Sequence, residues 1–169
     1  HGGGIEPATT ELAYTIAHCG DYNYFSFKGM RSKGNNELHV TSTHYDDQIA
    51  LDLVRGSQRT VAIHGCEGNE SVAYIGGSDD RLIELITESL EDIGISVREA
   101  PHHISGTQEN NIVNMTQTQG GVQLELTAQL RKELFKNRKS SRKNRENKDN
   151  WDDLMYDFAD AMKKAIERA

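Results

Sequence analysis

The chain has 169 residues, a formal net charge of −7, 36% hydrophobic residues and 7% aromatic residues. This length predicts a single domain, residues 1–169, that is large enough to bury a hydrophobic core. The sequence lacks any run of about 18 apolar residues, which argues against a membrane span, and no signal-peptide pattern is visible. We therefore expect a soluble monomer, either cytoplasmic or released by lysis.

Apolar periodicity predicts helices and strands that alternate along the chain. We expect helices at residues 9–19, 49–54 and 78–93 and from 130 onward, and strands at 22–27, 38–43, 60–63, 71–75, 95–98 and 122–126. Such alternation predicts a three-layer αβα domain of the α/β class. The strands at 22–27 and 38–43 are joined too closely for a crossover helix, so we expect them to be antiparallel and the central sheet to be mixed.

Two segments late in the chain differ in charge and periodicity. Residues 137–149 are nearly all charged or polar, which predicts a basic, mobile excursion. Nine Lys and Arg residues stand against two Glu residues between Arg131 and Lys148, a local charge of about +7. Asn150 is expected to cap a C-terminal amphipathic helix over about 150–168, whose apolar stripe packs on the core.

The first six residues form a candidate metal-binding loop. His1 and Glu6 flank three consecutive glycines and Ile5. Glycines allow a tight turn or a close approach of the backbone, and two histidines with one glutamate form a catalytic zinc set that leaves one position open. We predict that His1 and Glu6 bind one zinc ion. The other interpretation is a flexible end with an incidental histidine.

His64 and Glu125 are the candidates for a third ligand and a general base. His64 follows the buried strand 60–63 at its carboxyl end, where open α/β sheets place their sites. Glu125 lies between two leucines in strand 122–126, and burial raises the pKa of a carboxyl group, as suits a general base that takes a proton from water. Both residues have a structural alternative. A histidine at a strand end is often structural, and Glu125 would face solvent if strand 122–126 lay at the edge of the sheet.

Five motifs occur in order, at residues 1–7 (His-Gly-Gly-Gly-Ile-Glu-Pro), 42–46 (Ser-Thr-His-Tyr-Asp), 63–65 (Ile-His-Gly), 76–80 (Gly-Gly with Asp before a helix) and 120–126 (Gly-Gly-Val-Gln-Leu-Glu-Leu). Together they resemble the phage-type poly-γ-glutamate hydrolase family, compact relatives of zinc carboxypeptidases and of amidohydrolases of the aspartoacylase kind. The resemblance runs from residue 1 to about 135. It implies a zinc-carboxypeptidase-like fold, one zinc ion held by His1, Glu6 and His64, and Glu125 as general base. It also implies endo-type hydrolysis of γ-glutamyl amide bonds in poly-γ-glutamate, and a prophage or phage origin.

The chain departs from the family pattern in two places. Ala8 stands where glycine is expected, and Thr127-Ala128-Gln129 replaces a Ser-Arg-Gly-like stretch, which removes one arginine expected to bind substrate carboxylates. Arg131 remains as a candidate for that role. The other candidates for substrate binding are His44, at a predicted strand end, and Asn111 and Asn114, in the polar loop before strand 122–126.

Other functions fit parts of the sequence. A carboxypeptidase-like enzyme, or an N-acyl amino-acid deacylase with a small substrate, would use the same zinc set. A polyanion- or nucleic-acid-binding module would use residues 131–148, but only Phe135 is available there for stacking and the acidic remainder repels phosphate. We therefore expect no nucleic-acid partner. The basic stretch is either a solvated loop or a flap that holds polyglutamate near the zinc.

Overall fold

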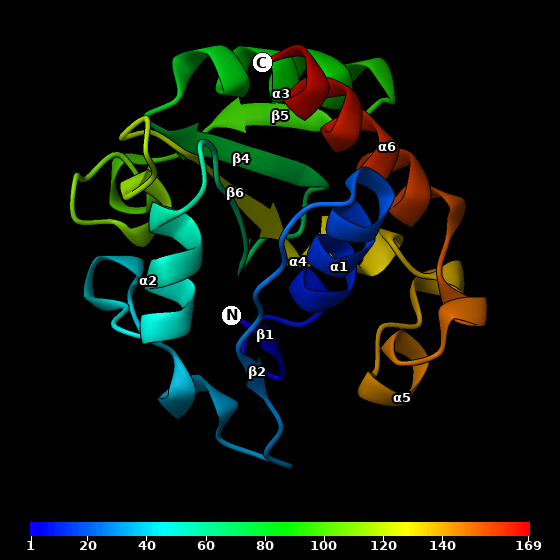
Figure 1. The fold of residues 1–169 in the computed structure, drawn as a ribbon. Helices are drawn as coiled ribbons and strands as arrows, with labels where there is room; N and C mark the ends of the chain where they lie inside the picture. The colour runs from blue at the N-terminus through cyan, green and yellow to red at the C-terminus, as the bar shows by residue number, and fades with distance from the viewer.

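The computed structural model describes residues 1–169 and has an α/β fold, with a mixed four-stranded central sheet flanked by helices (Figure 1). The strands are β1 (Gly2–Gly3), β2 (Lys28–Gly29), β3 (Val61–Cys66), β4 (Val72–Gly77), β5 (Ser96–Glu99) and β6 (Val122–Thr127). The helices are α1 (Thr9–Gly20), α2 (Gln48–Arg55), α3 (Asp80–Asp92), α4 (Ala128–Glu133), α5 (Arg142–Arg145) and α6 (Asp153–Arg168). None of the helices combines the length and the apolar character needed to cross a membrane.

The central sheet has the strand order β3-β6-β4-β5. β6 pairs in parallel with β3 and antiparallel with β4, and β4 pairs in parallel with β5. The predicted mixed sheet is confirmed, but its predicted source is wrong, because residues 22–27 and 38–43 do not form an antiparallel pair. All six residues of β6 are buried, as expected for a strand with a partner on both edges.

Local turns occupy the place of the predicted strand at 38–43. Short 3₁₀ helices span Asn35–Leu38 and Ser42–His44, and neither contains a buried residue. The Asn35 side chain accepts from the Arg31 N–H and donates to the Arg31 carbonyl, which closes a turn just before this run. A short apolar run without a face to bury has no reason to join a sheet. The chain pairs earlier instead, where β2 runs parallel to β1 in the glycine loop.

The C-terminal helix supplies much of the core. α6 packs against both α1 and α3 (Figure 1), and Met155, Phe158 and Met162 on its apolar stripe are fully buried. The helix is capped by Asp152, whose carboxylate accepts the Leu154 N–H, and not by Asn150.

The basic segment folds into short helical turns and is anchored to the glycine loop. Arg145, in α5, is 6% exposed. Its guanidinium donates to the Gly3 carbonyl at 3.1 Å and lies 3.3 Å from the Glu11 carboxylate. The Trp151 indole N–H donates to the Arg145 carbonyl at 2.8 Å. The mobility expected for the remainder of residues 137–149 stays a prediction.

Candidate active site

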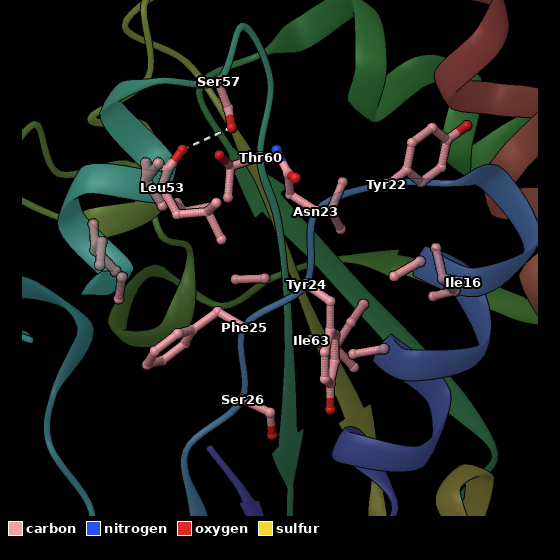
Figure 2. Close-up of a pocket in the computed structure, with 18 of the residues that line it drawn as sticks. Ile16, Tyr22, Asn23, Tyr24, Phe25, Ser26, Leu53, Ser57, Thr60 and Ile63 are labelled. Atoms are coloured by element: carbon pink, nitrogen blue, oxygen red, sulfur yellow. Dashed lines mark hydrogen bonds between the residues drawn. The ribbon is translucent and has the colours of Figure 1, made fainter.

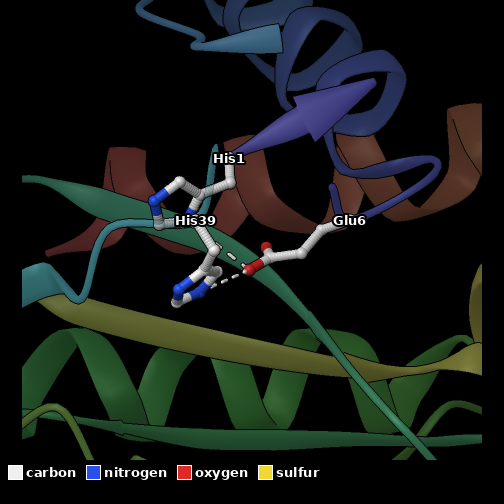
Figure 3. A group of neighbouring side chains, drawn as sticks. All are labelled: His1, Glu6 and His39. Atoms are coloured by element: carbon white, nitrogen blue, oxygen red, sulfur yellow. Dashed lines mark ion pairs between the residues drawn. The ribbon is translucent and has the colours of Figure 1, made fainter. Parts of the chain in front are cut away.

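Glycine is required in the loop that presents His1 and Glu6. Gly3 has a φ of +65°, and a Cβ there would lie 2.6 Å from the Gly29 carbonyl oxygen of the neighbouring strand. The Thr9 hydroxyl donates to the Glu6 carbonyl at 2.8 Å and ties the loop to the start of α1. The loop is thus held between β2 and α1, and the His1 and Glu6 side chains point toward each other (Figure 3).

Ala8 occupies a conformation that favours glycine. Its φ is +81°, in the left-handed region, at the position where the family pattern leads us to expect glycine. It is also 1% exposed, so the methyl group lies in the core and the surrounding contacts hold the strained backbone.

The imidazoles of His1 and His64 converge on the two oxygens of Glu6. His1 Nδ1 lies 3.5 Å from Glu6 Oε1, and His64 Nδ1 lies 3.5 Å from Glu6 Oε2. The two imidazole rings have their centroids 5.6 Å apart. The structure therefore brings together the three residues predicted as zinc ligands, from the glycine loop and from β3.

The donor atoms of His1 and Glu6 lie at a separation that suits a zinc ion. Tetrahedral ligands about 2.0–2.1 Å from zinc lie roughly 3.3 Å from one another, which is close to the 3.5 Å between His1 Nδ1 and Glu6 Oε1. His64 lies at the same distance from the other Glu6 oxygen, but it is not in the group of His1, Glu6 and His39 whose ligand atoms all lie within 4.8 Å of one another. His1 Nδ1 is buried without a hydrogen-bond partner, which is costly unless another group meets it. The Ser42 hydroxyl lies 3.4 Å from His64 Nε2, where it can hold the ring with Nδ1 turned to the cluster.

A further imidazole, that of His39, also reaches the cluster. His39 Nε2 lies 3.4 Å from Glu6 Oε1, and its ring centroid is 4.4 Å from that of His1 (Figure 3). His1, Glu6 and His39 each have one ligand atom within 4.8 Å of those of the other two, so His39 is a second candidate for the third ligand. Its side chain is 45% exposed. Sequence reasoning missed it because it lies on a turn without ligand spacing, and only the tertiary fold places it here.

The charges of the cluster reinforce one another. Burial alone would raise the pKa of Glu6, but the imidazoles of His1 and His64, each 3.5 Å from its carboxylate, outweigh burial and hold that pKa at about 2. Burial would lower the pKa of His64, and the neighbouring Glu6 carboxylate reverses this and raises it. Glu6 is therefore ionised at neutral pH, and a metal ion must compete with a proton for His64.

Glu125 lies beside His64 across the β3–β6 pair. The strand register aligns Glu125 with His64 on one side and with Tyr74 on the other. Glu125 is 7% exposed, so the alternative in which it faces solvent on an edge strand is wrong. Burial is the largest cause that raises its pKa; His64 opposes it, and the Glu6 charge adds to it. Its role as general base stays a prediction.

The two asparagines predicted to bind substrate are buried and bonded within the protein. Asn111 is 3% exposed and Asn114 is 5% exposed. Asn114 accepts from the Ser78 hydroxyl at 2.7 Å and donates to the Gly106 carbonyl at 2.7 Å. These contacts hold the loop before β6, so neither side chain is presented to a ligand.

The turn that contains His44 reaches the cluster through other residues. Ser42 contacts His64, and the Tyr45 ring centroid lies 5.7 Å from that of His1. His44 itself is exposed and is not among the residues grouped around Glu6. Substrate binding by His44 stays a prediction.

Arg131 ties together the three segments that carry the site. Its guanidinium donates to the carbonyls of Pro7 at 2.8 Å, Cys66 at 2.9 Å and Leu126 at 3.0 Å. These residues closely follow the predicted ligands on the loop and on β3, and the predicted base on β6. A Cβ at Gly65 would come within 2.8 Å of the guanidinium carbon, so glycine is needed there. Arg131 is 8% exposed, and its donors hold these three segments together, so it acts as a brace in this structure. Substrate binding by Arg131 stays a prediction.

We expect Arg131→Met to destabilise the fold by about 3 kcal/mol, because three buried or partly buried carbonyls lose a charged donor. Chemical unfolding measures this loss. Arg98→Met is the matched control, because the exposed Arg98 pairs only with Glu70 and its loss should change stability far less. Equal losses in the two variants would show that Arg131 braces nothing.

A cavity of about 540 Å³ adjoins the cluster (Figure 2). Its walls come from α1, the extended segment 22–27, the end of α2 and β3, and His1 and His64 border it. Apolar side chains such as Ile16, Phe25 and Ile63 make up most of the lining. The cavity falls within the usual size range of ligand pockets, so the cluster borders a space that can admit a ligand.

Comparison with known proteins gives the same family as the sequence motifs. The family model for poly-gamma-glutamate hydrolase matches residues 1–161. The SPbeta prophage-derived UPF0714 protein YoqZ of Bacillus subtilis (strain 168) is 38% identical over 137 residues, which are 80% of this chain and 49% of that protein. The UPF0714 protein YndL of the same organism is 33% identical over 137 residues, 80% of this chain and 54% of that protein. The chain thus spans about half the length of these two relatives.

Two solved structures share the fold. A bacteriophage poly-gamma-glutamate hydrolase superposes with a TM-score of 0.93 at 34% identity, over 98% of this chain and 79% of that one. A structure described as the zinc-free apo form of YndL gives a TM-score of 0.91 at 30% identity, over 99% of this chain and 81% of that one. The resemblance predicted from the motifs is confirmed, and the chain belongs to the poly-gamma-glutamate hydrolase family.

Proposed function

We propose that this chain is a zinc-dependent amidohydrolase that cleaves γ-glutamyl amide bonds of poly-γ-glutamate. The observation that carries the proposal is the convergence of the Nδ1 atoms of His1 and His64 on the two oxygens of Glu6, beside the buried Glu125. Family membership supports the substrate class, and the zinc-free form described for YndL supports the metal.

The chemistry divides between the metal site and one carboxylate. His1, Glu6 and His64 would hold one zinc ion, which when bound supplies a Lewis acid and lowers the pKa of water. Glu125 takes a proton from the attacking water and passes it to the leaving amide nitrogen. The raised pKa that burial gives Glu125 lets its carboxyl group keep the proton between those two transfers.

Two further groups suit an anionic polymer. His39 is the half-exposed imidazole of the cluster, and we assign it a role in binding substrate rather than zinc. The basic segment lies beside the glycine loop, where Arg145 bonds Gly3 and Arg142 approaches the Met30 carbonyl at 3.4 Å. Positive charge at that position would attract a polyglutamate chain toward the cluster.

We also infer a three-layer αβα domain of the zinc-carboxypeptidase type. Its support is the mixed sheet, whose strand β3 contributes His64 in register with Glu125 on β6. The same site would also serve a carboxypeptidase-like enzyme or an N-acyl amino-acid deacylase, so the assay must separate polymer from small substrates.

Metal removal tests the proposed function. The purified chain should shorten poly-γ-glutamate in a size assay, lose that activity after treatment with a chelator, and regain it with zinc. The reason is that the proposed reaction needs a bound zinc ion with one open coordination position. Polyglutamate of similar length with α-linkages is the control and should stay intact. Activity that survives chelation would contradict the zinc mechanism, and cleavage of N-acyl amino acids alone would favour the small-substrate enzyme.

A further inference from the structure

A chain of side-chain amides leads from the loop at 101–119 to Glu125. Gln123 lies two residues before Glu125, on the same face of β6, and is 5% exposed. Its Nε2 donates to Glu125 Oε1 at 3.0 Å and to the Ile104 carbonyl at 3.2 Å. Its Oε1 accepts from Asn111 Nδ2 at 3.1 Å. Gln123 is therefore bonded on both sides, by the loop and by the predicted base.

A backbone N–H sets the direction of this chain of bonds. The Val113 N–H donates to Asn111 Oδ1 at 3.1 Å, so the NH₂ group of Asn111 must face Gln123. An amide that receives a donor presents its oxygen to it, which turns the NH₂ group of Gln123 toward Glu125. The second neighbour of Gln123 Nε2 is a carbonyl oxygen, which requires the same orientation.

The loop is shaped around the Gln123 side chain. Gly106 has a φ of +67°, and a Cβ there would lie 2.9 Å from Gln123 Cβ and 3.0 Å from its Oε1. The Asn114 amide holds the Gly106 carbonyl at 2.7 Å and keeps this part of the loop in place. Turning the Gln123 amide over would set its oxygen against the Ile104 carbonyl and the Glu125 carboxylate, so the amide keeps one orientation as long as Asn111 donates to it.

We propose that Gln123 and Asn111 are positioning residues that fix the carboxylate of Glu125 for proton transfer, an inference that rests on the proposed function in which Glu125 is the general base. The bond from Gln123 occupies Oε1 of Glu125 and leaves Oε2 to take the proton. Asn111 acts one step further away by fixing which end of the Gln123 amide faces Glu125. The long polar loop before β6 thus serves the base and not the substrate.

The test reverses the direction of the bonds with almost no change in volume. In Asn111→Asp, a carboxylate oxygen faces Gln123, so the Gln123 amide should turn and set its oxygen against Glu125. We expect kcat on poly-γ-glutamate to fall roughly 10- to 100-fold, as for other partners that orient a catalytic group, with KM and zinc content unchanged. Asn110→Asp is the matched control, because Asn110 is exposed in the same loop, and it should stay within about 2-fold of the wild type.

A double-mutant cycle separates positioning from a merely structural role. In a Glu125→Gln background, Asn111→Asp should cause no further loss, because the group that it aims is already gone. A loss that multiplies in that background, or an Asn111→Asp variant as active as Asn110→Asp, would overturn the proposal. If Asn111→Asp fails to fold, Gln123→Met gives the same cycle without a new charge. Full turnover in Glu125→Gln alone would instead remove the proposed function.

Discussion

Replacing Glu125 with Gln should lower kcat for poly-γ-glutamate cleavage by roughly 10²- to 10⁴-fold, the usual contribution of a general base. Gln has nearly the same shape but cannot take the proton from water. Glu125 is buried next to His64 and is not among the residues that converge on Glu6, so zinc should stay bound. Kinetics on the polymer and zinc analysis of the same preparation measure the two effects.

The control for this variant is Glu99→Gln, an exposed position on β5, which should keep full activity. The pH dependence gives a second check on the wild-type protein. Burial raises the pKa of Glu125, and a base works only when ionised, so kcat/KM should fall as the pH drops through that raised pKa. Turnover retained by Glu125→Gln would show that another group takes the proton.

Replacing His64 with Ala should weaken zinc binding by roughly 100-fold or more, since ligand loss costs more than the 10- to 100-fold typical of residues that only orient a ligand. The prediction that His64 follows a strand buried on both faces is wrong, because His64 lies within β3, which forms an edge of the sheet and is mostly half-buried. Its own side chain is buried, with Nδ1 turned to Glu6 and Nε2 near the Ser42 hydroxyl. Competition with a zinc-binding dye measures the affinity. The measurement should be made at fixed pH, because the raised pKa of His64 makes protons compete with zinc more strongly as the pH falls.

His39→Ala is the matched variant, since it removes the other imidazole near Glu6. We expect it to keep zinc within about 10-fold of the wild-type affinity and to lose activity on the polymer, as fits a group on the substrate side. The reverse pattern, with zinc lost in His39→Ala and kept in His64→Ala, would make His39 the third ligand and leave His64 as a structural residue.

The parts of the site that were predictable are those carried by short local patterns. His1 and Glu6 share one glycine loop, His64 follows an apolar strand, and Glu125 alternates with leucines, so each could be found from its own neighbours. His39 could not be found in this way, because its place depends on turns that replace a predicted strand. The parallel pairing of β1 with β2 was equally invisible, since two glycines and a Lys-Gly pair carry no strand pattern.

The surroundings of Arg131 and Asn111 differ from what the sequence led us to expect. Arg131 was predicted to bind substrate as the arginine that remains after the departure at 127–129, and Asn111 as an amide in the polar loop before strand 122–126. In the structure those donors are used up by backbone carbonyls and by Gln123. Whether a polar side chain faces solvent or bonds within the protein depends on tertiary contacts. The Arg131 bond to the Pro7 carbonyl joins residues more than a hundred positions apart, and no local pattern encodes such a contact.

The anchoring of the glycine loop by Arg131 and Arg145 has a consequence for the order in which the protein matures. The two arginines follow Pro7 and Gly3 by 124 and 142 residues, so they are translated after the loop that they hold. Until both arginines have been made, His1 and Glu6 lack the contacts that fix their geometry. We therefore expect the site to take its final shape only after the segment that contains both arginines has folded onto the loop.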